Sequence, residues 1–351
     1  MRKISLLLIA FIMCGIYSCK NDEREFANFD YTTTYFPYQY PVRTLVLGDY
    51  VYDNNNDNNL KFKISARVGG LYENKSNWTV GYIVDPTLVK NLATTANTFD
   101  GKITASIDTL KLLPSEYYTL TPKDEFMIPS GGFTGDVEVQ LTEAFLNDPL
   151  AVTTKYVLPL RIITSSADSV LNGKTFFERP DYRIAGNWVV LPKDFTIFGI
   201  KYVNNFHGKY LHRGKSVITD TIQSTVLQTI IYRQKYVEQD ELWALQTIGR
   251  NAVKITGTLR KTPTSPGKFS MNLTFDSNNN CTISTAKGSV FKVTGTGKFV
   301  KNAETWGKLP HNAIYLNYLV REGANKHAVI DTLVFRDKSV TFLEYTPVVW
   351  H

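Results

Sequence analysis

Three acidic residues of the C-terminal half, Glu238, Asp240 and Glu241, stand close enough in the sequence to be considered for acid–base chemistry. Cleavage of a glycosidic bond needs two carboxylates on opposite sides of a sugar, one acid and one base or nucleophile. The chain lacks the alternation of strands and helices that builds the barrel often used for this purpose. Charged residues on a strand or loop face explain the cluster more simply, although a hydrolase with an unrecognised site stays an alternative.

Other catalytic motifs are also absent from the sequence. The chain has no Gly-x-Ser-x-Gly elbow, no His-Glu-x-x-His motif and no P-loop. Its five histidines lie scattered through the C-terminal half, without the spacing of zinc ligands. Cys281 alternates with Ile283, which predicts a buried and inert thiol. We therefore predict a protein that is not an enzyme, with no catalytic residue, no metal and no cofactor.

The segment Asp-Asn-Asn-Asn-Asp-Asn at residues 53–58 begins like a calcium-binding loop. An EF-hand loop needs glycine at its sixth position and a bidentate glutamate at its twelfth. Here Asn58 and Ile64 occupy those positions. A surface turn rich in Asn and Asp is the better interpretation, and a looser calcium site stays open.

Aromatic residues are the most suggestive binding groups, because the chain has 20 Tyr, 20 Phe and 5 Trp. An exposed flat ring gives the apolar face of a sugar a surface on which to pack, while nearby polar groups bind the hydroxyls. Trp306 lies in a polar, loop-like stretch, and Trp243 and Trp188 lie in strand-like runs of the same half. We predict that Trp306, with Trp243 or Trp188, contacts a glycan; packing in a core is the alternative for each.

The elements that must position these residues are strands. Residues 61–68, 156–162, 269–275 and 314–320 alternate apolar and polar side chains, as half-buried strands do. Many such runs, separated by Gly, Asn and Asp, are typical of antiparallel sandwiches and barrels. The sequence therefore predicts an all-β protein.

A polar stretch at residues 164–168 separates a strong strand from a fresh start at Gly173. We predict an Ig-like β-sandwich over residues 29–165. A larger antiparallel domain over residues 173–351 would be barrel-like, resembling a lipocalin, or a second sandwich, and would bind the ligand.

The N-terminus has the features of an export signal. Arg2 and Lys3 precede a short apolar run that ends in Ser18-Cys19, the order of a secretory signal. The cysteine directly after a small residue resembles a bacterial lipobox. The resemblance implies that residues 1–18 are removed and that Cys19 is acylated, so that residues 19–28 form a lipidated, flexible tether. The run is too short to span a membrane as a helix.

Removing residues 1–18 leaves 333 residues, enough for two domains. The formal charge falls from +7 to +5 with the loss of Arg2 and Lys3. Acidic residues interrupt the basic ones throughout, so the pattern argues against a nucleic-acid partner. Cys281 is the only cysteine left besides the lipidated one, so burial must hold the fold together.

Several segments resemble surface lipoproteins of Bacteroidetes. The first domain resembles their Ig-like N-terminal domain at residues 45–49, 53–58, 69–74 and 156–162. Residues 236–240 and 295–299 are similar to their second domain, and residues 20–23 resemble an acidic surface-export tag.

The resemblance implies an outer-membrane lipoprotein of a polysaccharide-utilisation system that faces the cell exterior. By this resemblance it would capture a glycan in a SusE-like role beside a SusC/SusD-type importer. A docking or scaffold lipoprotein of the same complex that binds no sugar is the alternative.

Overall fold

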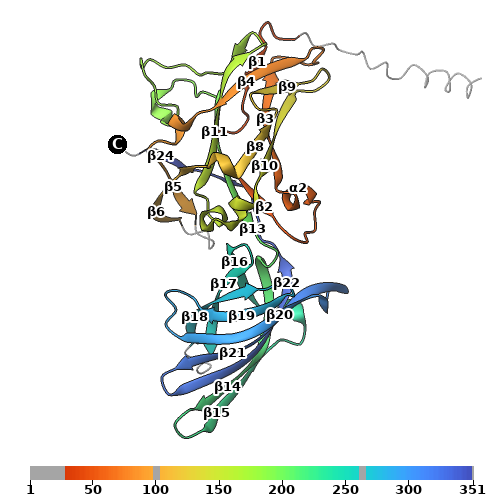
Figure 1. Cartoon of the computed structure of the whole chain (residues 1–351), viewed down its shortest axis with the longest axis vertical. Helices are drawn as coiled ribbons and strands as arrows, with labels where there is room; N and C mark the ends of the chain where they lie inside the picture. Colours follow the sequence, from red (N-terminus) through yellow and green to blue (C-terminus); the bar gives the residue numbers. More distant parts are fainter. Residues whose placement is uncertain (1–27, 98–102, 261–265, 350–351) are drawn as a thin grey trace, which may run out of the picture.

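The computed structural model describes residues 28–97, 103–260 and 266–349. The chain is all-β, as its alternation predicts, and folds into a sandwich domain and a closed barrel (Figure 1). Cys19 and the tether to residue 27 lie outside the described residues, so lipidation stays a prediction. Within the described part of the chain, no helix has the length and apolarity needed to cross a bilayer.

The first domain contains two large sheets. One has the order β12 (Ser169–Val170), β1 (Thr33–Tyr35), β3 (Lys61–Gly69), β10 (Thr134–Leu141) and β8 (Tyr118–Thr121). The other has the order β23 (Leu343–Glu344), β2 (Pro41–Val46), β13 (Phe195–Val203), β11 (Tyr156–Ser165), β4 (Trp78–Val84) and β9 (Glu125–Ile128), with β7 (Lys111–Leu112) also beside β11. A small third sheet joins β24 (Pro347–Val349), β5 (Leu92–Asn97) and β6 (Ile103–Thr109).

Short helical turns connect these strands. They are α2 (Asn55–Asn58), α3 (Glu143–Asn147) and the 3₁₀ turns η1 (Pro86–Val89), η2 (Ser115–Tyr117), η3 (Pro149–Val152), η4 (Ala185–Asn187) and, in the second domain, η5 (Val237–Gln239). The sandwich core follows from strand alternation. On β3, Phe62 and Ile64 point inward, Val137 of β10 lies beside Ile64, and Leu158 of β11 belongs to the same apolar cluster. Apolar side chains from both sheets meet between them, which is how a sandwich buries its two inner faces.

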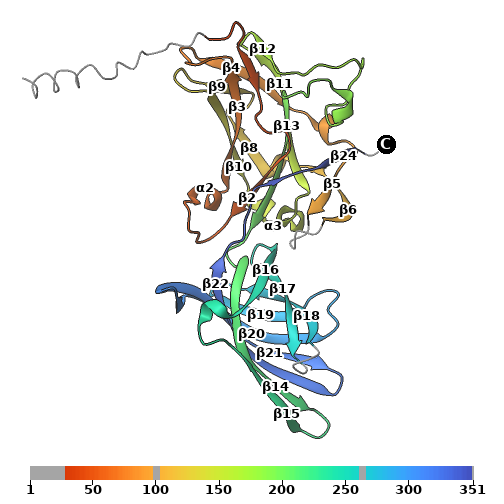
Figure 2. The same ribbon diagram turned by 180° about the vertical axis from the view of Figure 1, so that it is seen from behind.

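The second domain is an eight-stranded antiparallel barrel. Its strands are β14 (Gly208–Asp220), β16 (Glu241–Gly249), β17 (Ala252–Arg260), β18 (Pro266–Phe275), β19 (Asn280–Thr285), β20 (Lys292–Trp306), β21 (Leu309–Glu322) and β22 (Asn325–Asp337). Pairing of β22 with β14 closes the ring. β15 (Thr225–Tyr232) continues beside β14 where β16 ends, and the β14–β15 hairpin extends away from the sandwich (Figure 2).

Large side chains fill the barrel interior. Trp243, Met271, Phe269 and Tyr318 are buried in a single apolar cluster. Gly257 lies against two of these rings, because a Cβ built there would come within 2.7 Å of both Trp243 and Phe269. Filling of this kind is usual for small barrels, and these side chains occupy the centre of the barrel.

The division between the domains differs from the one expected at residues 165–173. β13 pairs with β2 and β11 in the first domain, and the tail after the barrel returns there as β23 and β24. The chain's C-terminal end therefore lies beside the sandwich (Figure 1). The polar stretch at 164–168 connects β11 to β12 within one domain, and the barrel itself spans 208–337.

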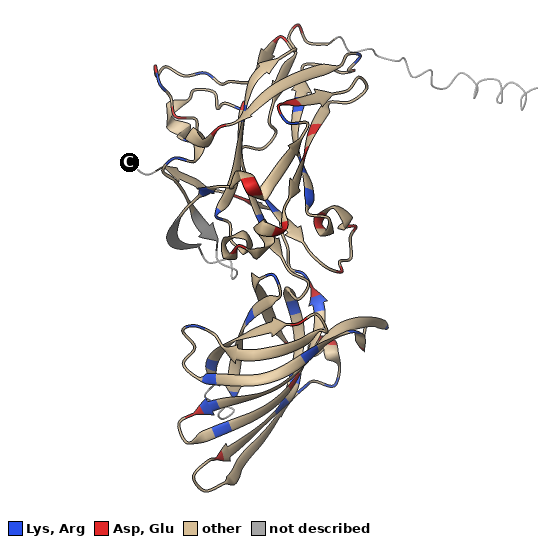
Figure 3. Cartoon of the chain, in the orientation of Figure 1, with Lys and Arg blue, Asp and Glu red and all other residues tan. Residues whose placement is uncertain are grey.

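Polar contacts join the two domains where the chain crosses between them. The Asn204 side chain donates to the carbonyls of Gly249 and Ala252, both at 3.0 Å, and Lys338 donates to the Asn205 carbonyl at 2.7 Å. Basic and acidic residues are interspersed along the strands of both domains (Figure 3). The basic surplus lies in the barrel, because residues 205–339 contain 19 Lys and Arg against 9 Asp and Glu, while residues 28–204 contain 16 against 19.

Candidate functional site: an aromatic cavity in the first domain

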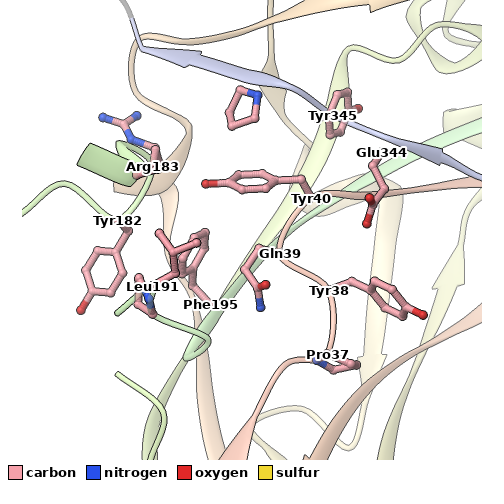
Figure 4. A pocket seen from close by; sticks show the side chains of 13 residues that line it. Pro37, Tyr38, Gln39, Tyr40, Tyr182, Arg183, Leu191, Phe195, Glu344 and Tyr345 are labelled. Atoms are coloured by element: carbon pink, nitrogen blue, oxygen red, sulfur yellow. The ribbon is translucent and has the colours of Figure 1, made fainter. Parts of the chain in front are cut away.

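A cavity of about 400 Å³ opens at the edge of the sandwich (Figure 4). We call it the aromatic cavity. Three segments form it: the loop between β1 and β2 (residues 37–40), the connection into β13 (182–195) and the tail after the barrel (344–347). Its lining residues are Pro37, Tyr38, Gln39, Tyr40, Tyr182, Arg183, Ala185, Leu191, Pro192, Phe195, Glu344, Tyr345 and Pro347.

Backbone hydrogen bonds hold the three segments together. The Tyr345 N–H donates to the Tyr40 carbonyl at 2.9 Å, and the Ile197 N–H donates to the Gln39 carbonyl at 2.7 Å. Pro41 lies opposite Glu344 where β23 pairs with β2. The tail after the barrel is thus an integral wall of the cavity.

Aromatic rings make up most of the cavity wall. Tyr182 and Tyr40 each meet Phe195 edge to face, with ring centroids 5.5 and 5.8 Å apart. Tyr345 packs its ring on Gly199, where a Cβ would come within 2.4 Å of the phenol oxygen, and its hydroxyl donates to the Thr154 carbonyl at 2.5 Å. Tyr38 is 55% exposed, so one ring of the set faces solvent.

Arg183 fixes the connection into β13 (residues 182–195) against the sandwich. Its guanidinium donates to both carboxylate oxygens of Asp181, at 2.8 and 2.7 Å, and to the carbonyl of Lys90. A bidentate pair of this kind is strong and well oriented. Arg183 therefore serves to hold the wall. The Gln39 side-chain NH₂ donates to the Phe36 carbonyl at 2.8 Å, and Glu344 supplies a charged group at the cavity.

Burial sets the protonation of the groups around the cavity. It raises the pKa of Tyr40 and of Tyr345, so both phenols stay neutral. Beside Phe195, burial raises the pKa of Asp194 to about 6, against the lowering effect of its own backbone N–H and of Arg161. Glu344 is the acidic residue among those lining the cavity, so the lining supplies no pair of carboxylates placed across a sugar. The arrangement is suited to binding and offers no acid–base pair.

The three tryptophans predicted from the sequence lie in three different places. Trp188, at the end of η4, is half-buried, meets Tyr182 at 5.5 Å and donates to the Asp181 carbonyl at 2.8 Å. It supports a wall of the aromatic cavity from outside the lining. It belongs to the connection on the first domain and not to the barrel.

Trp243 and Trp306 both lie in the barrel. Trp243 is 5% exposed and stacks on His212 at 3.6 Å, so its ring offers no open platform. Trp306 ends β20 instead of lying in a loop; it is half-buried, stacks on His311 at 4.3 Å and donates to the Phe335 carbonyl at 3.3 Å. No two of these three tryptophans lie in a common site.

The acidic cluster around Glu241 is part of an ion-pair network at one end of the barrel. Glu241 accepts from His212 at 2.6 Å and from Arg260, and Asp240 accepts from Arg213 at 2.5 Å. Burial opposes the charge on Glu241, but the bonds from His212 and Arg260 lower its pKa to about 2. Asp240 and Glu241 are thus held in ion pairs with basic side chains, whereas Glu238 is exposed. A cavity of about 120 Å³ adjoins these pairs.

His212 lies at the centre of this network. Its Nε2 is 2.9 Å from Asp331, a carboxylate that is fully buried and also accepts from Tyr318 at 2.7 Å and from Tyr232. Burial disfavours the imidazolium, yet the bonds with Asp331 and Glu241 outweigh it and raise the pKa of His212. With both ring nitrogens engaged by carboxylates, His212 is placed to stabilise charge in the barrel core.

The segment at 53–58 forms α2 and a turn. Asp57 is buried there, pairs with Arg43 and accepts from the Val46 N–H at 2.9 Å. Asn54 donates to the carbonyls of Val46 and Gly48, both at 2.7 Å. These side chains brace the end of β2, as a turn rich in Asn and Asp does. In the described ranges, no three His, Cys, Asp or Glu residues gather as metal ligands.

The fold and the cavity define a two-domain, all-β protein that combines an open sandwich with a filled barrel. Residues 205–339 match the profile of a family described as a domain of unknown function, DUF5627, and residues 29–169 match a profile described as an N-terminal domain. No curated protein matches the chain.

One solved structure is similar over nearly the whole molecule. It is a protein of unknown function from Bacteroides ovatus with 35% sequence identity and a TM-score of 0.82, covering 92% of this chain and 100% of that one. The chain belongs to the family of that protein, which fits the resemblance to Bacteroidetes proteins seen in the sequence.

Two further Bacteroides ovatus structures share 13% identity. They are a protein of unknown function (TM-score 0.45) and a multidomain protein including DUF1735 (TM-score 0.44), and each match covers 89% of this chain and 97% of the other.

Proposed function

We propose that the protein binds a glycan without cleaving it, and that the aromatic cavity is its binding site. The observation that carries this proposal is a cavity of about 400 Å³ walled by Tyr38, Tyr40, Tyr182, Phe195 and Tyr345. Rigid aromatic rings provide contact area at low entropic cost, and phenol hydroxyls add polar contacts at their edges. A sugar presents the matching surface, with C–H faces and a rim of hydroxyls.

The cellular setting of this proposal comes from the sequence. The signal ending at Cys19 and the resemblance to Bacteroidetes surface lipoproteins support a lipid-anchored protein on the outer membrane, facing outward. In that setting the aromatic cavity would hold glycan for a SusC/SusD-type importer, in a SusE-like role.

A docking role is the second candidate, and one observation favours it. The β14–β15 hairpin carries exposed apolar side chains: Ile222 (81%), Val226 (63%), Leu227 (54%) and Ile231 (62%). Apolar surface of this kind marks protein contacts in many structures. A scaffold protein of the importer complex would use this hairpin and leave the aromatic cavity without a sugar.

The test is a screen of the chain from residue 20 onward against plant, host and microbial polysaccharides by retardation in affinity gels. We expect retardation by at least one polysaccharide without release of product. Tyr38→Ala should weaken that binding about tenfold or more, equivalent to about 1.4 kcal/mol.

Tyr236→Ala on the barrel is the matched control, since Tyr236 is 49% exposed and Tyr38 is 55% exposed. Trp306→Ala tests the site predicted from the sequence. If Tyr236→Ala weakens polysaccharide binding as much as Tyr38→Ala does, or if only Trp306→Ala weakens it, the binding site would lie on the barrel. If no polysaccharide of the panel retards the protein and a SusC/SusD-like pair co-purifies with it, the docking role would be established.

A further inference from the structure

A second cavity, of about 190 Å³, adjoins the aromatic cavity and shares two of its lining residues, Pro37 and Tyr38. We call it the basic subsite. β3 contributes Lys63, Ser65 and Arg67 from its outer side, and β13 contributes Thr196 and Phe198. Its lining residues are Phe36, Pro37, Tyr38, Pro41, Lys63, Ile64, Ser65, Arg67, Thr134, Thr196 and Phe198.

The charged side chains that line the basic subsite are both cations. Lys63 and Arg67 stand four positions apart on the same face of β3, with Ser65 between them, and both are exposed. Lys63 pairs with Asp136 at 3.0 Å, which neutralises part of its charge. Arg67 has no carboxylate within ion-pair distance in the described part of the chain, so its guanidinium is available to a ligand. Guanidinium groups bind carboxylate and sulfate oxygens with two parallel hydrogen bonds.

The floor of the basic subsite combines apolar surface with an unused hydroxyl. Thr196 is 1% exposed, and its Oγ1 has no hydrogen-bond partner among the described residues. Leaving a buried hydroxyl unpaired costs free energy that a ligand hydroxyl could recover. Phe198 lies beside it and stacks on Phe62 at 5.5 Å, which fixes the ring.

Tyr38 stands between the two cavities. It lines both of them, and its ring meets the exposed Phe342 at 5.8 Å. A ligand longer than one sugar can therefore cross this aromatic pair and occupy both cavities. The aromatic cavity would take a sugar by its ring face, and the next sugar would enter the basic subsite.

We propose that the glycan is an oligosaccharide or polysaccharide that carries an anionic group, with the charged sugar held in the basic subsite by Arg67 and Lys63. This inference rests on the proposed function of the aromatic cavity and names its ligand class. The anionic group is a carboxylate of a uronic acid or a sulfate ester, and the two present the same kind of oxygen to Arg67.

The experiment compares matched polysaccharides with the chain from residue 20 onward in affinity gels. Polygalacturonate against its methyl ester isolates the carboxylate, and carrageenan against chemically desulfated carrageenan isolates the sulfate ester. We expect one anionic member to bind about tenfold or more tightly than its neutral counterpart at low salt, with the difference shrinking as NaCl screens the charges.

Arg67→Ala, and the double variant Lys63→Ala/Arg67→Ala, should reduce that binding to the level of the neutral counterpart. The matched control is Lys292→Ala/Arg321→Ala, which removes a Lys and an Arg that lie opposite each other on exposed barrel strands. Because Lys63 also pairs with Asp136, the single Arg67 variant separates loss of the ligand contact from any change in the sandwich.

The outcomes separate the two proposals. Equal binding of neutral and anionic members, unchanged in the Arg67 variants, would overturn this inference and leave the aromatic cavity as a site for neutral glycans. Equal losses in the Lys292/Arg321 control would also overturn it, because the effect would then be one of net charge. Absence of binding to every polysaccharide would overturn the proposed function and this inference with it.

Discussion

The sandwich and the barrel are both built from alternating, aromatic-rich strands, yet they present their rings differently. In the barrel, the pairing of β14 with β22 closes the sheet, and Trp243, Phe269 and Tyr318 are enclosed by it. In the sandwich, the sheets stay open, and three chain segments meet at their edge around Tyr38 and Tyr40. Closure turns aromatic residues into core, while an open edge leaves them free to contact a ligand.

This difference assigns separate roles to the two regions. Large apolar side chains fill the barrel core, and the polar network of His212, Glu241 and Asp331 is paired internally. The cavity beside this network is small, about 120 Å³, and is lined mainly by charged and polar side chains. The open edge of the sandwich holds two adjoining cavities with exposed Tyr38 between them. We therefore expect substitutions in the barrel to change stability, and substitutions at the sandwich edge to change binding.

The largest expected effect is that of Asp331→Ala in the barrel. The change removes the fully buried carboxylate that faces His212, Tyr318 and Tyr232, and leaves their donors unpaired in the core. Breaking a buried pair in this way costs about 3–5 kcal/mol. Denaturant unfolding should show that loss, whereas glycan binding by the remaining folded protein should be unchanged.

Asp337→Ala on the same strand is the control, because its carboxylate is 45% exposed and lies 3.6 Å from Arg336. Exposed pairs of this kind contribute about 0–1 kcal/mol. A small effect of Asp331→Ala, similar to that of Asp337→Ala, would show that the network does not stabilise the barrel. Loss of glycan binding in folded Asp331→Ala protein would contradict the separation of the two regions.

Alternation was enough to predict the fold class. Residues 61–68, 156–162, 269–275 and 314–320 all lie in strands, because period two follows directly from the geometry of a half-buried sheet. The predicted domain boundary at residues 165–173 differs from the structure, in which the first barrel strand begins at Gly208. A polar stretch breaks a strand whether the next strand joins the same domain or another one, and β13 joins the first domain.

The site was harder to predict, because its walls are far apart in the sequence. Tyr40, Tyr182 and Tyr345 become neighbours only when β13 and the tail after the barrel pair with the first domain. A local signal did exist: three tyrosines and a phenylalanine crowd residues 35–41 together with two prolines. Residue type alone pointed to Trp243 as a glycan contact, but the barrel buries its side chain.

A smaller effect is expected from Asp194→Asn beneath the aromatic cavity. The ordinary pKa of an aspartate is near 3.8, and burial raises that of Asp194 to about 6, so the fold favours the neutral carboxyl. Its contribution to stability is therefore fully present below pH 3.8 and is lost as the pH rises through about 6. The shift corresponds to about 3 kcal/mol at most, and relaxation around the charge should reduce this to about 1–2 kcal/mol.

The measurement is the difference in unfolding free energy between Asp194→Asn and the unchanged chain, followed from pH 4 to pH 8. The variant should gain about 1–2 kcal/mol at pH 8 relative to pH 4, because it stays neutral throughout. Exposed Asp124→Asn provides the control and should show no such trend. A flat difference for Asp194→Asn would mean that the carboxylate is well solvated at the edge of the sandwich.

The smallest expected effect is on the barrel thiol when a ligand binds to the sandwich. Cys281 is 3% exposed, lies beside Gly297 and has a pKa raised to about 12 by burial, so a thiol reagent should label it only after unfolding. In the chain from residue 20 onward it is the sole cysteine, which makes labelling specific. A polysaccharide bound at the aromatic cavity should leave the labelling rate unchanged, because the filled barrel takes no part in binding. A change of more than about twofold, equivalent to about 0.4 kcal/mol, would show that the contacts of Asn204 and Lys338 couple the barrel to the open edge.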